Sequence, residues 1–195
     1  MNLVVATAPA IEPLTLSETL LHLRVDIVED NDLVIGLISA AREYCEAAAR
    51  RTFINTTFDL YLDAWPLYGQ FELPNPPLVS VTGVYYTDEN GDEAEFSSAN
   101  YIVDSSSEPG RVRKKSTASW PTTTLQEIRG VRVRFVAGYG STRSSVPEKY
   151  RQAMKLLIGH WYENRETVLA AQGYSVLEMP FAVKALLGID RGGFF

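Results

Sequence analysis

Few residues of this 195-residue chain have the types and spacing that catalysis or metal binding requires. His160 and Glu163 are one helical turn apart, as a pair of metal ligands can be, but no second histidine or cysteine lies near them in sequence. The other histidine, His22, lies in an apolar segment that is typical of a helix in a core or an interface. The single cysteine, Cys45, excludes an internal disulfide and a cysteine-based zinc cluster.

The remaining candidates for catalytic chemistry have simpler structural interpretations. No G-x-S-x-G motif is present, and the stretch GYGS at 138–141 lacks the spacing and the lysine of a phosphate-binding loop. Asp59 and Asp63 share one predicted strand, where carboxylates usually form a solvated face. We therefore expect no catalytic residue, no cofactor and no metal. A small hydrolase that uses Asp, Glu or His160 is the less favoured alternative.

A group of basic residues is the most distinctive chemical feature of the chain. Residues 111–134 contain seven cations and one acidic residue, Glu127. In strands, such cations line one face at every second position and can contact nucleic-acid phosphates without reading base sequence. No helix-turn-helix, zinc-finger or RNA-recognition motif accompanies them, and a solvated or salt-bridged strand face is the alternative. The candidate DNA-channel residues are Arg111, Arg113, Lys114, Lys115, Arg129, Arg132 and Arg134.

Charge is divided unevenly along the chain, whose net charge is −6. Residues 1–95 carry 16 acidic residues against 4 arginines, net −12, whereas residues 96–195 carry 8 acidic against 14 basic residues, net +6. Opposite charges can bring identical subunits together head to tail, although an uneven distribution without a function is the alternative. No run of about 18 apolar residues occurs, so no membrane span is expected. The first 13 residues lack the basic region of a signal peptide.

Hydrophobic spacing predicts four helices, at residues 14–25, 31–51, 146–165 and 181–188. Thr15 with Glu18, and Ser145 with Glu148, have the spacing of capping boxes at the first and third of them. The second and third helices are expected to pack on each other through apolar side chains. These are Leu37, Ile38, Ala41, Met154, Leu157 and Trp161.

Residues 53–138 change to alternating polarity and frequent turn residues, which predicts an antiparallel β subdomain of about six strands. Asn90-Gly91 predicts a hairpin turn within it, and Trp120 is the expected anchor of a polar loop at 115–130. The predicted fold class is therefore α+β. A single domain over residues 1–195 would consist of a small bundle of about four helices with this β subdomain inserted.

Short motifs distributed over the chain together resemble a known family. They are HLRVD (22–26), YCEAAARRTF (44–53), ELPNPPLVSV (72–81), YIVD (101–104), PGRV (109–112), WP (120–121), VRFVAGYG (133–140), VPEKYRQAMKLLIGHWYENRE (146–166) and MPFAVKALL (179–187). In this order they resemble the head–tail connector proteins of long-tailed phages and prophages, of the adaptor or head-completion type, including those of phage-derived gene transfer agents. The final LLGIDRGGFF departs from the more polar end that is usual in the family.

The resemblance implies a structural virion protein, made in the bacterial cytoplasm and located at the head–tail junction of a phage or phage-like particle. Connectors of this type form a homo-oligomeric ring, usually of twelve copies, beneath the portal protein. The ring extends the channel for the packaged DNA and is the platform for the downstream tail or stopper protein, with no role for a membrane. Connectors do no covalent chemistry, which fits the lack of catalytic motifs. A monomeric, sequence-nonspecific nucleic-acid-binding module is the main alternative.

The C-terminal segment, residues 167–195, is expected to be a hinge (167–178) followed by a portal-docking element. Its short helix is too small to be stable alone, and two phenylalanines follow two glycines at its end. Such a segment typically becomes ordered on a partner, with aromatic residues as anchors, although packing on its own domain is the alternative. The expected docking residues are Met179, Phe181, Val183, Leu186, Leu187, Phe194 and Phe195.

Overall fold

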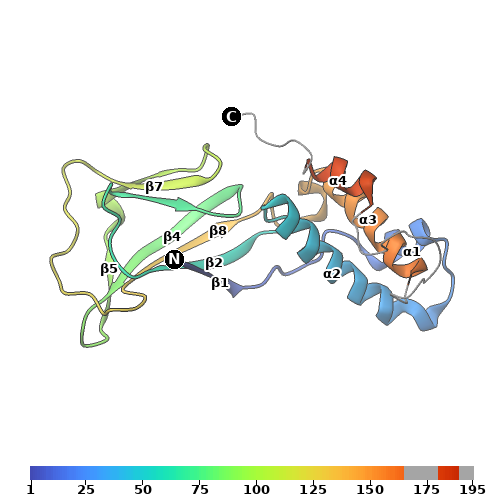
Figure 1. Cartoon of the computed structure of the whole chain (residues 1–195), viewed down its shortest axis with the longest axis horizontal. Coiled ribbons are helices and arrows are strands. Elements are labelled where there is room, and N and C mark those ends of the chain that lie inside the picture. Colours follow the sequence, from blue (N-terminus) through green and yellow to red (C-terminus); the bar gives the residue numbers. More distant parts are fainter. Residues whose placement is uncertain (165–179, 189–195) are drawn as a thin grey trace, which may run out of the picture. The chain divides into compact units, whose positions relative to one another are not determined.

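The computed structural model describes residues 1–164 and 180–188. The chain divides into two compact units, each drawn in Figure 1. A β unit contains residues 1–10 and 50–141, and a helical unit contains residues 11–49 and the chain from 142 onward. Within the described residues, four α-helices and two antiparallel sheets confirm the predicted α+β fold. Within the described part of the chain, no helix has the length and apolarity needed to cross a membrane.

The β unit consists of two sheets. A five-stranded sheet has the order β1-β2-β8-β4-β5, and a three-stranded sheet has the order β3-β7-β6. The strands are β1 (Asn2–Thr7), β2 (Thr56–Leu62), β3 (Gln70–Leu73), β4 (Leu78–Thr87), β5 (Glu93–Phe96), β6 (Tyr101–Asp104), β7 (Gly110–Lys114) and β8 (Val131–Ala137). Sequence analysis did not predict β1, because its partner β2 is distant in sequence and no local turn joins the two strands.

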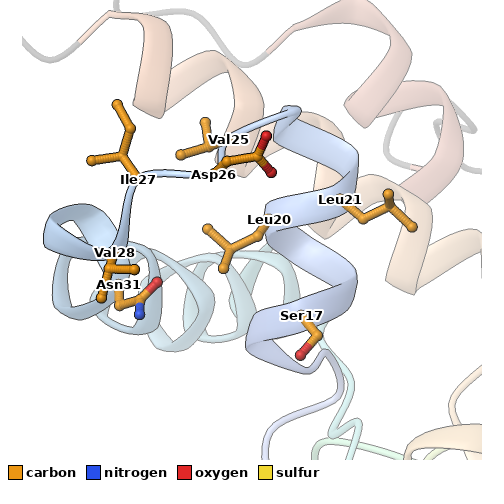
Figure 2. Close-up of a pocket in the computed structure, with 8 residues that line it drawn as sticks. All are labelled: Ser17, Leu20, Leu21, Val25, Asp26, Ile27, Val28 and Asn31. Carbon is orange, nitrogen blue, oxygen red and sulfur yellow. The ribbon is translucent and has the colours of Figure 1, made fainter.

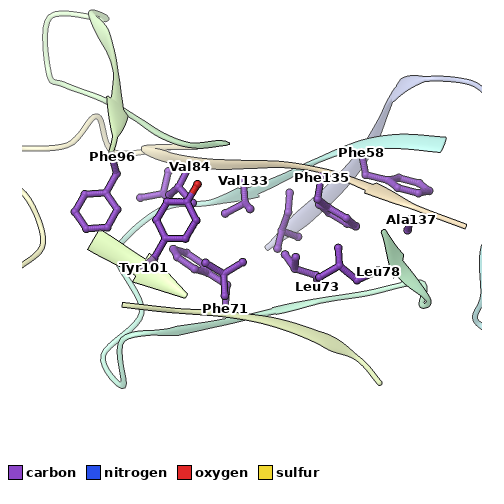
Figure 3. Close-up of a cluster of buried hydrophobic side chains, with 13 residues drawn as sticks. Phe58, Phe71, Leu73, Leu78, Val84, Phe96, Tyr101, Val133, Phe135 and Ala137 are labelled. Atoms are coloured by element: carbon purple, nitrogen blue, oxygen red, sulfur yellow. The ribbon is translucent and has the colours of Figure 1, made fainter. Parts of the chain in front are cut away.

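The two sheets pack face to face over a single hydrophobic core (Figure 3). Strand β8 shows the reason, because Val131, Val133 and Phe135 point inward while Arg132 and Arg134 point outward. Phe71 and Tyr101 of the three-stranded sheet belong to the same buried cluster. Gly110 allows the sheets to approach closely, since a Cβ at this position would lie 2.6 Å from the Leu78 side chain.

Two local predictions within the β unit are confirmed. Strands β4 and β5 form a hairpin in which the Asp88 carboxylate accepts hydrogen bonds from the N–H groups of Asn90 and Asp92, both at 2.9 Å. The indole of Trp120 anchors the loop between β7 and β8 by stacking on Trp65, with ring centroids 4.3 Å apart.

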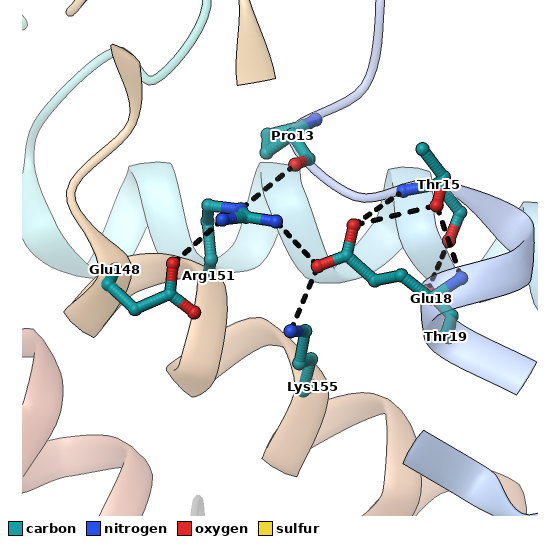
Figure 4. Close-up of polar contacts among 7 residues, drawn as sticks. All are labelled: Pro13, Thr15, Glu18, Thr19, Glu148, Arg151 and Lys155. Atoms are coloured by element: carbon teal, nitrogen blue, oxygen red, sulfur yellow. Dashed lines mark hydrogen bonds and ion pairs between the residues drawn. The ribbon is translucent and has the colours of Figure 1, made fainter. Parts of the chain in front are cut away.

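The helical unit contains α1 (Leu16–Leu23), α2 (Asn31–Ala49), α3 (Glu148–Glu163) and α4 (Phe181–Leu187), with short 3-10 turns at Val28–Asp30 and Arg143–Ser145. A third 3-10 turn, Ser98–Asn100, lies in the β unit. The predicted capping box of α1 is present: the N–H of Glu18 donates to Thr15 Oγ1 at 3.1 Å, and the N–H of Thr15 donates back to the Glu18 carboxylate. Figure 4 shows that Arg151 and Lys155 of α3 reach the same carboxylate, which ties α1 to α3.

The second predicted capping box, Ser145 with Glu148, is wrong. Helix α3 begins at Glu148 directly after Pro147, without a side-chain cap. Pro147 restricts the residue before it, Val146, to extended backbone. Ser145 precedes Val146 and therefore lies outside the helix end. Its hydroxyl is instead 2.7 Å from that of Thr142.

Helices α2 and α3 pack on each other largely as predicted. Ile38, Ala41, Met154 and Leu157 are buried, and Trp161 contacts Tyr44 edge-on with ring centroids 5.8 Å apart. Leu37 is half-buried. Helix α4 packs on α3, which completes the core of this unit.

Candidate functional site

The candidate DNA-channel residues do not form one patch. Arg111 and Arg113 point outward from the three-stranded sheet, whereas Arg132 and Arg134 point outward from the five-stranded sheet. Because the inner faces of the two sheets pack on each other, these pairs lie on opposite faces of the β unit. Lys114 is the last residue of β7, Lys115 follows it, and Arg129 precedes β8.

The outer face of the five-stranded sheet holds a buried ion-pair network around Asp59, which is only 5% exposed. Arg134 donates two hydrogen bonds to the Asp59 carboxylate, at 2.8 and 2.7 Å. Arg132 donates two to Glu93, at 3.0 and 2.7 Å, and also lies 3.5 Å from Asp59. The hydrogen bonds from Arg134 hold the pKa of Asp59 below its usual range. These two arginines therefore fit the salt-bridged interpretation of the basic residues.

An aromatic ring covers this network. The Arg132 guanidinium lies 4.3 Å from the ring centroid of Tyr85, within the range of a cation–π contact. The Tyr85 ring in turn lies over Gly83, where a Cβ would come within 2.6 Å of the phenol oxygen. Arg129 has a similar contact with Tyr61, at 5.2 Å.

The cations of the three-stranded sheet have mixed surroundings. Arg111 pairs with Asp104 at 2.6 Å, on an exposed part of the surface. The ammonium groups of Lys114 and Lys115 donate to backbone carbonyls, including Ala99 O at 2.7 Å from Lys115. Arg113 is exposed and forms no ion pair with any residue that the structure describes.

Beside Arg113 lies an exposed apolar turn that sequence analysis missed. The N–H of Gly69 donates to Pro66 O at 3.0 Å, and this turn presents Leu67 and Tyr68 at 97% and 93% exposure. The turn and Arg113 border a shallow hollow of about 310 Å³ that also includes Lys114 and Trp120. Two large apolar residues between a proline and a glycine were the available sequence signal.

The helical unit has an apolar groove, which sequence analysis also missed. It has a volume of about 390 Å³ and lies between α1 and the segment that leads into α2. Figure 2 shows Leu20 projecting from α1 toward this segment. Leu21 and Val28 are 81% and 73% exposed. The residues that line the groove are Ser17, Leu20, Leu21, Val25, Asp26, Ile27, Val28 and Asn31.

The expected portal-docking residues have different surroundings. Val183 and Leu187 are buried in the helical unit and Leu186 is half-buried, whereas Phe181 is 79% exposed. For Val183 and Leu187, the alternative interpretation applies: they pack within their own chain instead of being free for the portal. Met179, Phe194, Phe195 and the predicted hinge at 167–178 lie outside the described residues.

The surroundings of Cys45 and His160, two residues considered for catalytic chemistry, are those of residues with a structural role. Cys45 is fully buried, and burial raises the pKa of its thiol to about 12, so it is a poor nucleophile at neutral pH. His160 lies 3.5 Å from the amide nitrogen of Asn164. Among the described residues, no three His, Cys, Asp or Glu side chains are grouped closely enough to hold a metal ion.

No known protein family and no curated protein matches the chain. Solved structures do match it over almost its full length. A chain from the neck of an empty gene transfer agent (GTA) particle, computed with C6 symmetry, is 27% identical with a TM-score of 0.78; the match covers 96% of this chain and 94% of that one. A chain from the virion of a native GTA particle is 26% identical with a TM-score of 0.76, at 96% and 94% coverage.

A third similar chain comes from the neck of a native GTA particle computed with C12 symmetry. It is 25% identical with a TM-score of 0.71, and the match covers 96% of this chain and 93% of that one. All three neighbours are chains of GTA particles, two of them from the neck. The likeness supports a structural protein of a virion or phage-like particle, the class that the sequence motifs predicted.

Proposed function

We propose that this protein is an adaptor: a subunit of a ring that docks beneath the portal, extends the DNA channel and provides the platform for tail attachment. The observation that carries the proposal is the likeness over 96% of the chain to chains from the neck and virion of GTA particles. Two of those structures were computed with C6 and C12 symmetry, which fits a ring of about twelve copies as the family resemblance implies.

Only one outer face of the β unit would then line the channel, because the basic residues lie on its two opposite faces. Asp59 and Glu93 neutralise Arg132 and Arg134, so these two contribute little net charge. Arg129 has no carboxylate partner for its guanidinium group within the described residues, and it is the better candidate for a phosphate contact. One such cation from each copy, without base-reading contacts, suits a channel through which DNA must slide.

The portal contact is assigned to the C-terminal segment. In α4 the exposed aromatic side chain is Phe181, while Val183 is used for packing. Phe181→Ala should therefore reduce portal binding without lowering stability. Val183→Ala should lower stability by about 1–3 kcal/mol, because it removes buried methyl groups.

The direct test is electron microscopy of the purified protein mixed with the portal protein of the same particle. A ring of subunits seated on the portal is the expected result. Because Val183 and Leu187 belong to the core, the test keeps α4 and changes only its exposed aromatic residue: Phe181→Ala should leave a folded protein that no longer joins portal-bearing heads. A protein that stays monomeric with its portal, and that binds DNA tightly alone, would instead be a nucleic-acid-binding module. If the Phe181→Ala protein still completes heads, the portal contact lies elsewhere on the chain.

A further inference from the structure

We propose that the Pro66–Gly69 turn of one copy inserts Leu67 and Tyr68 into the apolar groove of the helical unit of the next copy. The turn and the groove are both exposed in the single chain, and both are apolar. The inference rests on the proposed ring, because a ring requires two different surfaces on each subunit that fit one another.

The exposure of the turn is the first observation. Leu67 and Tyr68 occupy the two central positions of a hydrogen-bonded turn and are almost fully accessible. Scattered apolar residues on a surface are ordinary, but two adjacent large side chains at the tip of a turn form a protrusion suited to a pocket. Tyrosine is also among the residues that contribute most to binding at interface centres.

The groove supplies a matching surface. Its walls are mostly aliphatic, and its volume of about 390 Å³ falls within the range of binding pockets. At its edge, the side-chain oxygen of Asn31 is buried without a hydrogen-bond donor among the described residues. An unpaired buried acceptor is costly, so the groove is incomplete in the isolated chain.

Charge identifies the occupant as a second copy. The groove segment, residues 24–32, contains four carboxylates and one arginine, and within the described residues Asp26, Glu29 and Asp32 form no ion pair. The turn is bordered by Arg113, which also has no ion pair there, and by Lys114. An acidic rim around the groove and a basic rim around the protrusion attract each other, and they select the head-to-tail arrangement over contacts between like surfaces.

Disulfide trapping tests the contact. Tyr68→Cys and Val28→Cys are combined in one chain, which is mixed with portal and oxidised. Native Cys45 is buried and does not interfere. The proposal expects a ladder of covalent oligomers from the double variant, dimers at most from either single variant, and no ladder from a matched pair of exposed positions away from both surfaces, Thr122→Cys with Lys149→Cys.

Two further variants separate an interface from a folding defect. Leu67→Ser with Tyr68→Ser should abolish oligomers yet leave the urea midpoint unchanged, because both side chains are exposed. Arg113→Glu should weaken assembly at least tenfold at low salt, and Asp26→Lys in the same chain should restore part of it. Restoration by a second charge change in the same sequence is expected only if copies contact each other through these surfaces.

The outcomes are distinct. If wild-type rings form on the portal but the double-cysteine variant gives no ladder, this contact is wrong and the adaptor proposal stands. A cross-link from Tyr68→Cys to the portal or to a tail protein would also overturn it, since the occupant would then be a different protein. If neither rings nor a ladder form, both proposals fail.

Discussion

Buried Asp59 should be coupled to its partner Arg134 much more strongly than the members of an exposed pair of the same chemistry are to each other. Asp59→Asn keeps the shape of the side chain but removes the charge that accepts two hydrogen bonds from Arg134. A hydrogen bond to a charged group contributes about 1.5–3 kcal/mol, and breaking a fully buried pair costs about 3–5 kcal/mol. Since the Arg134 side chain is partly exposed and can recover water, we expect a loss of about 2–3 kcal/mol.

Asp104 and Arg111 provide the matched control. Their carboxylate and guanidinium are 2.6 Å apart, but both side chains are well exposed, so a coupling below about 1 kcal/mol is expected. Double-mutant cycles isolate each pair from the backbone contacts of its members. Urea unfolding followed by fluorescence of Trp65 and Trp120, in a Trp161→Phe background, reports on the β unit alone.

The stability that Asp59 contributes should depend on pH, and the direction follows from its pKa. The pKa of Asp59 is lower in the folded protein than the usual value of about 3.9 that it regains on unfolding. Its contribution is therefore fully present above about pH 4 and is lost as pH falls through the folded pKa. The difference in unfolding free energy between wild type and Asp59→Asn should be constant from neutral pH down to about pH 4 and should shrink at lower pH. Equal coupling in the two pairs would refute the reasoning from burial.

Three further predictions follow from the packing and the charges. Leu157→Ala should lower the unfolding free energy by about 2–5 kcal/mol in a urea titration followed by Trp161 fluorescence, and an unchanged midpoint would mean that Leu157 is not a core residue. Cys45 should react with a thiol reagent at pH 8 only as fast as the helical unit opens, so prompt labelling of the native protein would contradict its burial. The free protein should bind DNA weakly and with a steep salt dependence; Arg129→Gln should reduce the salt slope by about one contact and Arg134→Gln should change it little. A sequence-specific complex that survives high salt would contradict the channel assignment.

Features set by neighbouring residues were predictable from the sequence. The Thr15–Glu18 capping box and the Asn90-Gly91 hairpin depend on residues within one turn, and both are present. The alternation that places Arg132 and Arg134 on one face of β8 could also be predicted from the sequence. The same local reasoning was wrong at Ser145, where the intervening Pro147 decides where α3 begins.

Features set by distant partners were not predictable. Arg132 and Arg134 read as a positive patch in the sequence, but Glu93 and Asp59, which neutralise them, belong to other strands. The helix at 181–188 was predicted correctly, yet burial of Val183 against α3 depends on tertiary packing. Strand β1 depends on pairing with β2, so nothing near it in sequence identified it.

The position of β8 in its sheet has a consequence for synthesis of the protein. This strand lies between β2 and β4, yet it is the last strand of the sheet to leave the ribosome. Until Ala137 has emerged, β2 and β4 each keep an unpaired edge, and only local pieces such as the β4–β5 hairpin can form early. The β unit must therefore close late and in one step, through contacts between distant parts of the chain. Slow elongation before β8 would prolong the exposure of two strand edges, and a chaperone acting on the nascent chain would be most useful in that interval.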